Sequence, residues 1–257
     1  MDIQEPEITV TEPRLLNIPV ILGTARKGRA SEHAARLFTD LLNRRAGVTS
    51  DLIDIATVSM PVDDAGEAIK DPAFAKAMTE ADGVVIVSPE YNHSFPGLLK
   101  HVLDSCLSEY IHKAVGIVGV SAGIFGGARM IQGQLPVMRE LGLSTIFWDV
   151  NIGSVGKVFT EDGRLLDEAV VRRSERFIKE LIWMSKVLRY GREHVNVDEE
   201  GAERLPPVKC PKCGTIMTHH ADKEVTSVPP LEEVTVVAAL ACSNCGAQQA
   251  MVTSVTG

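Results

Sequence analysis

Short apolar runs recur at intervals along the first three quarters of the chain. The runs at 18–22, 84–87 and 114–120 consist almost entirely of Val, Ile, Leu, Ala and Gly. Such runs are typical of strands that a parallel sheet buries on both faces. Two further strands are predicted at 51–55 and 145–150.

Helical periodicity fills the stretches between these runs. After the first strand, apolar residues that include Ala34, Phe38 and Leu42 share one helical face, and Gly47 favours a stop beyond them. Further helices are predicted over about 72–81, 97–109, 127–141 and 167–190, the third with a bend at Pro136. Alternating strands and helices predict an α/β domain with a doubly wound, five-stranded parallel sheet. The acidic segment 61–71 lacks a period and is predicted to be a loop.

The loop after the first strand, GTARKGRAS from Gly23 to Ser31, has the composition of an anion site. Free N–H groups and the helix dipole at the start of the following helix both favour negative charge. A dinucleotide fingerprint needs three glycines, and this loop has only Gly23 and Gly28. A Walker loop needs Lys and a hydroxyl residue where this chain has Arg29 and Ala30.

A third alternative fits this loop better than either nucleotide motif. The hydroxyls of Thr24 and Ser31, with the guanidinium of Arg26, can surround a single terminal phosphate. We therefore predict phosphate binding here, against the alternative of an ordinary turn between a strand and a helix.

Two more loops follow buried strands. The strand at 84–87 leads into SPEYNHS, a polar segment with one aromatic residue, and the strand at 114–120 leads into the small-residue segment SAGIFGG. Open α/β sheets bind ligands at the carboxyl ends of their strands. Small residues let the backbone approach a flat ring closely. Taken alone, a glycine-rich turn required by packing explains the second segment better.

The three loops together resemble one family. SPEYN-x-S-x-PG-x-LK-x-x-x-D over 88–104, the phosphate loop G-[ST]-x-R-x-x-[RS]-x-S and the segment GVSAG-x-x-GGAR are similar to motifs of the NAD(P)H-dependent FMN reductases. This flavodoxin-like family includes quinone and azo-dye reductases. FTEDGRL at 159–165 resembles the late F-x-x-[DE]-G-x-L turn of the family, so the resemblance covers about 18–185.

The resemblance implies a fold, a reaction and a set of site residues. The strand order would be 2-1-3-4-5, and hydride would pass from NAD(P)H to FMN and onward to an acceptor such as free flavin, a quinone or an azo compound. Because the flavin carries this chemistry, no catalytic side chain is predicted. A homodimer or homotetramer whose interface covers the flavin edge is also implied. The residues expected at the cofactor are Thr24, Arg26 and Ser31 for the phosphate, and Pro89, Glu90, Tyr91, Asn92, Ser121, Gly123, Gly126 and Gly127 around the ring.

Composition narrows the class of protein and its partners. The chain has 257 residues, 45% of them hydrophobic, with a net charge of −8, so a nucleic acid is an unfavourable general partner. The acidic N-terminal stretch lacks the apolar core of a signal peptide, and no apolar run is long enough to span a membrane. We therefore expect a soluble, cytoplasmic protein.

Four of the five cysteines form two C-x-x-C-G pairs near the C-terminus. Cys210 and Cys213 make the first pair, and Cys242 and Cys245 make the second. Two such pairs complete a tetrahedral shell of four sulfur ligands, and a strand is predicted between them at 234–240. Zinc is the favoured metal, iron of the rubredoxin type is the rival, and a reducible disulfide pair is a third alternative.

These features predict four segments. They are an N-terminal tail at 1–16, a flavodoxin-like domain at 17–190, a linker at 191–208 and a zinc ribbon at 209–257. The remaining candidates are predicted to have no functional role: His93, His219 and His220 are expected at the surface, and Cys106 in the core. A second hypothesis is an FMN-binding redox sensor or electron carrier whose ribbon docks a partner, either a protein or a nucleic acid. Steady oxidation of NAD(P)H would separate an enzyme from such a carrier.

Overall fold

The chain forms two units. The computed structural model describes residues 14–195, 209–226 and 234–256. One compact unit is Met1–Asn196 and the other is Val197–Gly257. Most of the predicted tail (1–13) and most of the predicted linker (196–208) lie outside the described residues.

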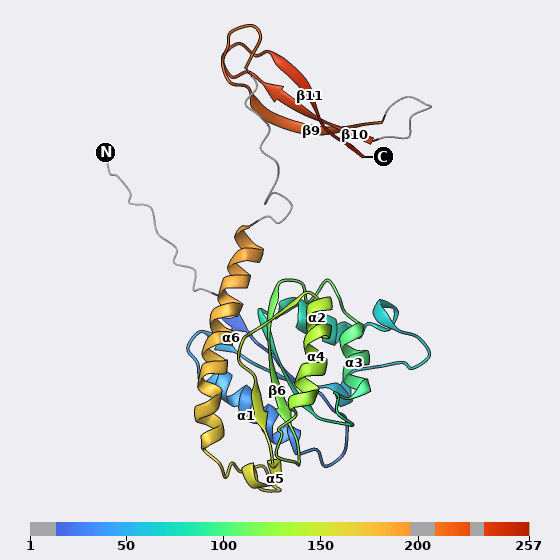
Figure 1. Ribbon diagram of the computed structural model, residues 1–257, viewed down its shortest axis with the longest axis vertical. Coiled ribbons are helices and arrows are strands. Elements are labelled where there is room, and N and C mark those ends of the chain that lie inside the picture. The colour runs from blue at the N-terminus through green and yellow to red at the C-terminus, as the bar shows by residue number, and fades with distance from the viewer. Residues whose placement is uncertain (1–13, 196–208, 227–233, 257) are drawn as a thin grey trace, which may run out of the picture. The chain divides into compact units, whose positions relative to one another are not determined.

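A parallel sheet forms the centre of the first unit (Figure 1). Its order is β4 (Leu52–Asp54), β2 (Val20–Leu22), β5 (Gly83–Pro89), β6 (Lys113–Val120) and β7 (Leu143–Thr145). All neighbouring strands in it run parallel. The predicted parallel α/β class is confirmed, and the predicted strands follow the order 2-1-3-4-5 along this path.

The number of strands differs from the prediction. The expected fifth strand at 145–150 is two short strands, β7 and β8 (Val150–Ile152), and both pair with β6. Between them Phe147 and Trp148 are exposed and pack edge to face, with ring centroids 5.0 Å apart. The chain therefore leaves the sheet at the centre of the predicted strand. A further pair, β1 (Leu16–Asn17) with β3 (Val48–Thr49), is too short to give a sequence pattern.

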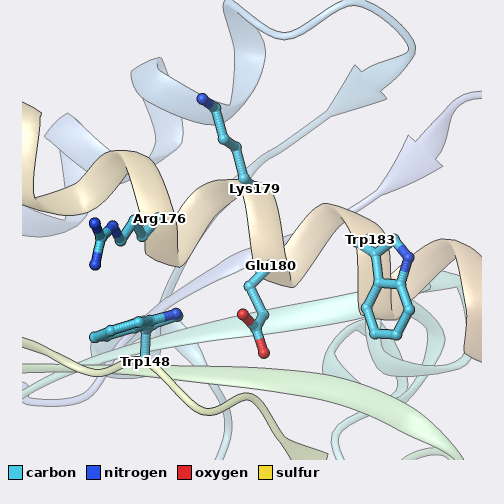
Figure 2. Close-up of a pocket in the computed structure, with 5 residues that line it drawn as sticks. All are labelled: Trp148, Arg176, Lys179, Glu180 and Trp183. Atoms are coloured by element: carbon cyan, nitrogen blue, oxygen red, sulfur yellow. The ribbon is translucent and has the colours of Figure 1, made fainter.

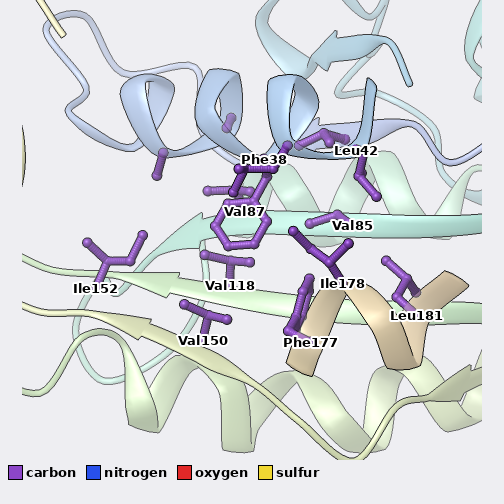
Figure 3. Packing of buried hydrophobic residues seen from close by; sticks show 14 of the residues in the cluster. Phe38, Leu42, Val85, Val87, Val118, Val150, Ile152, Phe177, Ile178 and Leu181 are labelled. Atoms are coloured by element: carbon purple, nitrogen blue, oxygen red, sulfur yellow. The ribbon is translucent and has the colours of Figure 1, made fainter. Parts of the chain in front are cut away.

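Helices cover both faces of this sheet (Figure 1). The helices are α1 (Ser31–Asn43), α2 (Pro72–Glu80), α3 (Gly97–Asp104), α4 (Ala128–Glu140), α5 (Val155–Val158) and α6 (Ala169–His194). Alternate residues of β5 point to opposite faces, so Val85 and Val87 pack with α1 and α6, whereas Val84 and Ile86 pack with α2, α3 and α4. Figure 3 shows Phe38 near the sheet on the first face, and its ring lies edge to face with that of Phe177 at 5.4 Å.

Several helix boundaries differ from those predicted. α3 ends at Asp104 rather than near 109. Just after this end, the Ser105 hydroxyl donates to the carbonyl of Val102 and so competes with the helical hydrogen bonds. α6 continues to His194, four residues into the predicted linker. Within 61–71, expected to be a loop, Gly66–Ile69 forms a 3-10 turn. None of the described helices has both the length and the hydrophobicity needed to cross a bilayer.

The second unit contains a three-stranded antiparallel sheet. Its strands are β9 (Thr218–Thr226), β10 (Val234–Ala241) and β11 (Gln248–Thr256), in the order β11-β10-β9. β10 coincides with the strand predicted between the cysteine pairs, whereas β9 and β11 were not predicted. The prediction of a small C-terminal β domain is thus confirmed.

Candidate functional site

A cleft of about 370 Å³ opens among the loops that follow β2, β5 and β6. Its lining consists of Arg26, Lys27, Gly28, Arg29, Ala30, Ser31, Pro89, Glu90, Tyr91, Val120, Ser121, Ala122 and Val155. The structure therefore brings together residues predicted from three separate loops. Five predicted residues are not part of this lining: Thr24, Asn92, Gly123, Gly126 and Gly127.

The first loop presents groups suited to a phosphate. The Ser31 hydroxyl oxygen is buried at the start of α1 and has no hydrogen-bond partner within the described structure. No side chain caps this helix. Arg26 is exposed beside it, and its guanidinium has no ion pair in the described part of the chain. An orphaned hydroxyl, an open helix N-terminus and a free cation together fit an anionic group.

Thr24, which is predicted to bind the phosphate, also connects two loops of the cleft. Its side chain is buried, and its Oγ1 lies 2.9 Å from the hydroxyl of Tyr91 and accepts a 3.3 Å hydrogen bond from the Arg26 N–H. The Thr24 hydroxyl therefore joins the first loop to the second. In this geometry it positions the loop, and Ser31 is the freer donor.

Arg29, which was not among the predicted cofactor-binding residues, holds the first loop in place. Its guanidinium donates to the carbonyl of Thr24 at 2.7 Å, to Glu32 at 3.4 Å and to Asp54 at the end of β4. The Arg29 side chain is only 12% exposed. Because all these bonds are internal, Arg29 shapes the loop, whereas Arg26 remains available to a ligand.

The second loop is a tight turn over Tyr91–Ser94. Reciprocal backbone hydrogen bonds of 2.8 and 2.9 Å join its ends. Asn92 and His93 adopt φ values of +48° and +67°, which non-glycine residues seldom accept. This is the pattern of a two-residue hairpin turn with positive φ at both central positions. The turn exposes Asn92 and leaves Pro89, Glu90 and Tyr91 to line the cleft.

Arg129, at the start of α4, connects the second and third loops. It forms an ion pair with Glu90 at 2.6 Å, contacts His93 Nε2 at 2.8 Å and lies over the ring of Phe125 at 5.5 Å. His93 is exposed, as expected, but its ring is held by this arginine. Arg129 was not among the predicted site residues, although it ends the resembled segment GVSAG-x-x-GGAR.

Packing accounts for the glycines at the end of the third loop. Gly126 and Gly127 have φ values of +58° and +77°. A Cβ on Gly126 would lie 2.8 Å from Asn151, and one on Gly127 would lie 2.9 Å from the backbone of Gly119. Gly123 has open space around it, which leaves it accessible to a ligand.

The second unit brings the four predicted cysteines together. The Sγ atoms of Cys210, Cys213, Cys242 and Cys245 all lie within 4.8 Å of one another, and all four cysteines are free. The shortest sulfur–sulfur separations are 3.5, 3.5 and 3.7 Å. A tetrahedral ion with sulfur ligands at about 2.3 Å separates them by about 3.8 Å, so this donor set fits one metal ion.

Two matching turns build this cluster. The N–H of Gly214 donates to the carbonyl of Cys210 at 2.8 Å, and the N–H of Gly246 donates to that of Cys242 at 2.9 Å. Both glycines have positive φ, +74° and +69°. The Thr215 hydroxyl lies 3.4 Å from Cys213 Sγ, and this contact is the largest cause that lowers the pKa of Cys213 to about 6. Metals bind the thiolate form.

A second hollow of about 360 Å³ lies on the surface of α6, lined by Trp148, Arg176, Lys179, Glu180 and Trp183 (Figure 2). Arg176 stacks over the Trp148 ring at 5.4 Å. This hollow shares no residue with the cleft and has no loop suited to a phosphate. The cleft is therefore the better candidate for the active site.

Comparison with known proteins shows which family the sequence matches. The sequence profile of the family described as NADPH-dependent FMN reductase matches residues 16–155. This span contains the three loops of the cleft.

Individual relatives give the same result. A quinone reductase of Escherichia coli (strain K12) is 37% identical over 166 residues, which cover 61% of this chain and 88% of the relative. An NAD(P)H-dependent FMN reductase of Pseudomonas aeruginosa is 27% identical, with 65% of this chain and 94% of the relative covered. Among solved structures, the flavoenzyme NAD(P)H:(acceptor) oxidoreductase FerB from Paracoccus denitrificans shares the fold, with a TM-score of 0.56, 21% identity, and coverage of 67% of this chain and 98% of that one.

Proposed function

The chain belongs to the NADPH-dependent FMN reductase family and is an NAD(P)H-dependent oxidoreductase; on this premise we propose that the cleft holds one FMN with its phosphate at residues 26–31. The observation that supports this placement is the buried, unpartnered hydroxyl of Ser31 at the uncapped start of α1. The Ser31 hydroxyl would donate a hydrogen bond to a phosphate oxygen, and the charge of Arg26 would neutralise the phosphate.

The role of the protein in this reaction is placement. Bound FMN supplies the capacity to accept and pass on a hydride. Pro89, Glu90 and Tyr91 line one side of the cleft, and Ser121 lines another. Arg129 fixes Glu90, so this wall keeps its position when a ring and a nicotinamide bind. Such preorganisation lowers the entropy cost of bringing two reactants together.

Equilibrium titration of the flavin-free protein tests this placement. We expect one FMN site per chain and at least tenfold weaker binding of riboflavin, which lacks the phosphate, because charge-assisted hydrogen bonds contribute about 1.5–3 kcal/mol. Trp183→Ala, in the hollow on α6, is a control that should bind FMN like the wild type. Equal affinities for FMN and riboflavin would refute the phosphate assignment.

For the electron acceptor we propose a small quinone or azo compound. Relatives named quinone reductase and NADPH azoreductase support this choice. The test is NADPH oxidation by the FMN-loaded protein, with a benzoquinone and an azo dye offered separately. If the protein binds FMN but oxidises NADPH with neither the benzoquinone nor the azo dye, this acceptor class is contradicted.

We also propose that the chain assembles as a homodimer or homotetramer that covers the flavin edge. Ile124 and Phe125 follow the lining residues Ser121 and Ala122, and their side chains are 80% and 62% exposed. A second copy of the chain would bury these apolar groups. Light scattering should give a multiple of the 27.8 kDa chain mass. A monomer would refute the assembly, and an oligomer whose mass is unchanged in Phe125→Asp would rule this interface out.

For the second unit we propose structural zinc held by Cys210, Cys213, Cys242 and Cys245. Four sulfur donors leave no open position for a substrate, which is typical of structural zinc. Metal analysis of the purified protein should find about one zinc per chain. Iron, with visible absorption beyond that of flavin, would instead indicate an electron-transfer centre.

A further inference from the structure

The first loop of the cleft borders a second, larger cavity. This cavity measures about 880 Å³ and shares Gly28, Arg29, Ala30 and Val155 with the cleft. Residues 28–30 therefore separate two adjoining spaces, the flavin cleft and a pocket that continues between α1 and the segment after α5. A ligand bound in the cleft by its terminal phosphate would have this pocket beside that phosphate.

The wall of the pocket is apolar and partly aromatic. Val155, Phe159 and Leu166 line it; Leu166 is 52% exposed, whereas Val155 and Phe159 expose only 8% and 4% of their surface. The His33 ring lies 5.9 Å from the Phe159 ring, and a Cβ on Gly163 would lie only 2.7 Å from His33 Nδ1. This close approach keeps the imidazole in place. A fixed apolar and aromatic surface of this kind suits a planar heterocycle.

Of the two carboxylates that line the pocket, one is bound by neighbouring side chains and one is free to contact a ligand. Glu32 is engaged by Arg36 at 2.7 Å and by Arg29 at 3.4 Å. Glu161 is exposed and has no ion pair or hydrogen bond in the described part of the chain. Glu161 is thus the free carboxylate of this pocket, and carboxylates commonly accept hydrogen bonds from the hydroxyls of a ribose.

The cations lie at the opposite border, where the two spaces meet. Arg26 and Lys27 are exposed and line the cleft, and neither has a partner among the described contacts. They adjoin the shared backbone at Gly28. The pocket thus combines an apolar wall with a free carboxylate, and two free cations lie on the loop that it shares with the cleft.

We propose that this pocket takes the adenosine 5′-phosphate part of FAD, so that the chain binds FAD as well as FMN. The two phosphates of FAD would lie along residues 26–30, its ribose at Glu161 and its adenine against Phe159 and Leu166. This inference rests on the proposed function, because the flavin part must occupy the cleft. The other source of an adenosine phosphate is NAD(P)H, whose nicotinamide has to reach the flavin ring at the other end of the cleft.

Titration of the flavin-free protein with FMN and FAD separately tests the proposal. In the wild type we expect FAD to bind within about threefold of FMN or more tightly, since its extra part finds a matching surface. Leu166→Glu should weaken FAD by about tenfold through charge repulsion and lost apolar contact, and leave FMN unchanged. Glu161→Gln should weaken FAD by about threefold. Glu140→Gln, on the exposed end of α4, is the matched control and should change neither affinity.

Three results would overturn this inference. The first is FAD binding more than tenfold weaker than FMN in the wild type, and the second is an equal effect of Leu166→Glu on both flavins. The third is an increased KM for NADPH in Leu166→Glu with FAD affinity unchanged, which would assign the pocket to NADPH. Failure of the wild type to bind either flavin would instead refute the proposed function.

Discussion

The two units of this chain are stabilised by different means. The first buries apolar side chains on both faces of a parallel sheet, in two large clusters. The described cluster of the second consists of Cys210, Met217, Leu240 and Cys242 with Ala247 packed against it. Small domains bury too little surface to be stable without a staple. The comparison teaches that a metal in the second unit would take the place of a hydrophobic core, whereas the first unit has such a core and needs no metal for its stability.

The same contrast separates the candidate sites. The flavin cleft is built from loops that a rigid sheet holds in position, so its residues can be exposed without loss of the fold. In the second unit the proposed ligands are themselves the core, because Cys210 and Cys242 are buried. Substitution of an exposed cleft residue should therefore affect binding alone, whereas substitution of a cysteine ligand in the second unit should affect binding together with folding.

Removal of the metal ligands should have the largest effect. In Cys213→Ser with Cys242→Ser we expect loss of zinc and unfolding of the second unit, because structural zinc contributes roughly 10–16 kcal/mol of apparent free energy. Metal analysis should find no zinc, and amide hydrogen exchange over 209–217 should become fast. FMN affinity of the first unit should persist. Cys106→Ala, at the buried cysteine outside the cluster, is the control that keeps its zinc. Retained protection in the zinc-free variant would show that the second unit has a sufficient core.

A core truncation in the first unit should give the reverse result. Phe38 is fully buried against Phe177, so Phe38→Ala should lower the free energy of unfolding by about 3–5 kcal/mol without changing the zinc content. Both tryptophans of the chain, Trp148 and Trp183, belong to this unit, so their fluorescence during urea unfolding reports on it alone. Phe147→Ala removes a 78% exposed ring and should change stability by less than about 0.5 kcal/mol. Loss of zinc in Phe38→Ala would mean that the two units fold as one.

The sequence predicts strands well where burial is complete and poorly at the β7 edge of the sheet. β2, β5 and β6 are buried on both faces, and their continuous apolar runs mark them clearly. At the edge, Phe147 and Trp148 have the composition of strand residues but lie exposed between β7 and β8. Edge strands have a neighbour on one side only, so tertiary packing rather than propensity decides where they break.

The candidate site shows the same limit. Residues in the loops at the strand ends could be predicted because short motifs carry them. Arg29 and Arg129 were missed because their partners, Asp54 and Glu90, are 25 and 39 residues away in the sequence. Such contacts exist only once the strands are side by side, and single-sequence patterns do not contain them.

Arg26→Ala should have an intermediate effect, on binding but not on folding. The guanidinium is exposed and makes no internal ion pair in the described structure, so its loss should weaken FMN by roughly 1.5–3 kcal/mol and leave the free energy of unfolding unchanged. Isothermal titration with FMN measures the first quantity, and urea unfolding measures the second. Arg36→Ala removes a 64% exposed arginine on α1 and should leave FMN binding unchanged. An unaltered dissociation constant in Arg26→Ala would exclude Arg26 from the phosphate site.

The smallest expected effect concerns a polar atom within the core of the first unit. The Tyr110 hydroxyl is buried and has no hydrogen-bond partner in the described structure. Burying a hydroxyl without a partner costs free energy, so Tyr110→Phe should keep or raise the stability at pH 7, by up to about 1 kcal/mol.

The pH dependence of this variant makes the test sharper. Burial raises the pKa of Tyr110 well above its usual value. The unfolded chain releases the phenolic proton near pH 10, whereas the folded chain keeps it, so wild-type stability should fall as pH rises above about 10. Tyr110→Phe has no such proton, and its advantage should therefore grow from pH 10 to pH 11 in urea unfolding. Tyr190→Phe, at a 62% exposed ring, should match the wild type at both values. A variant less stable than the wild type by more than about 1 kcal/mol at pH 7 would show that the hydroxyl is satisfied, by water or by a second copy of the chain.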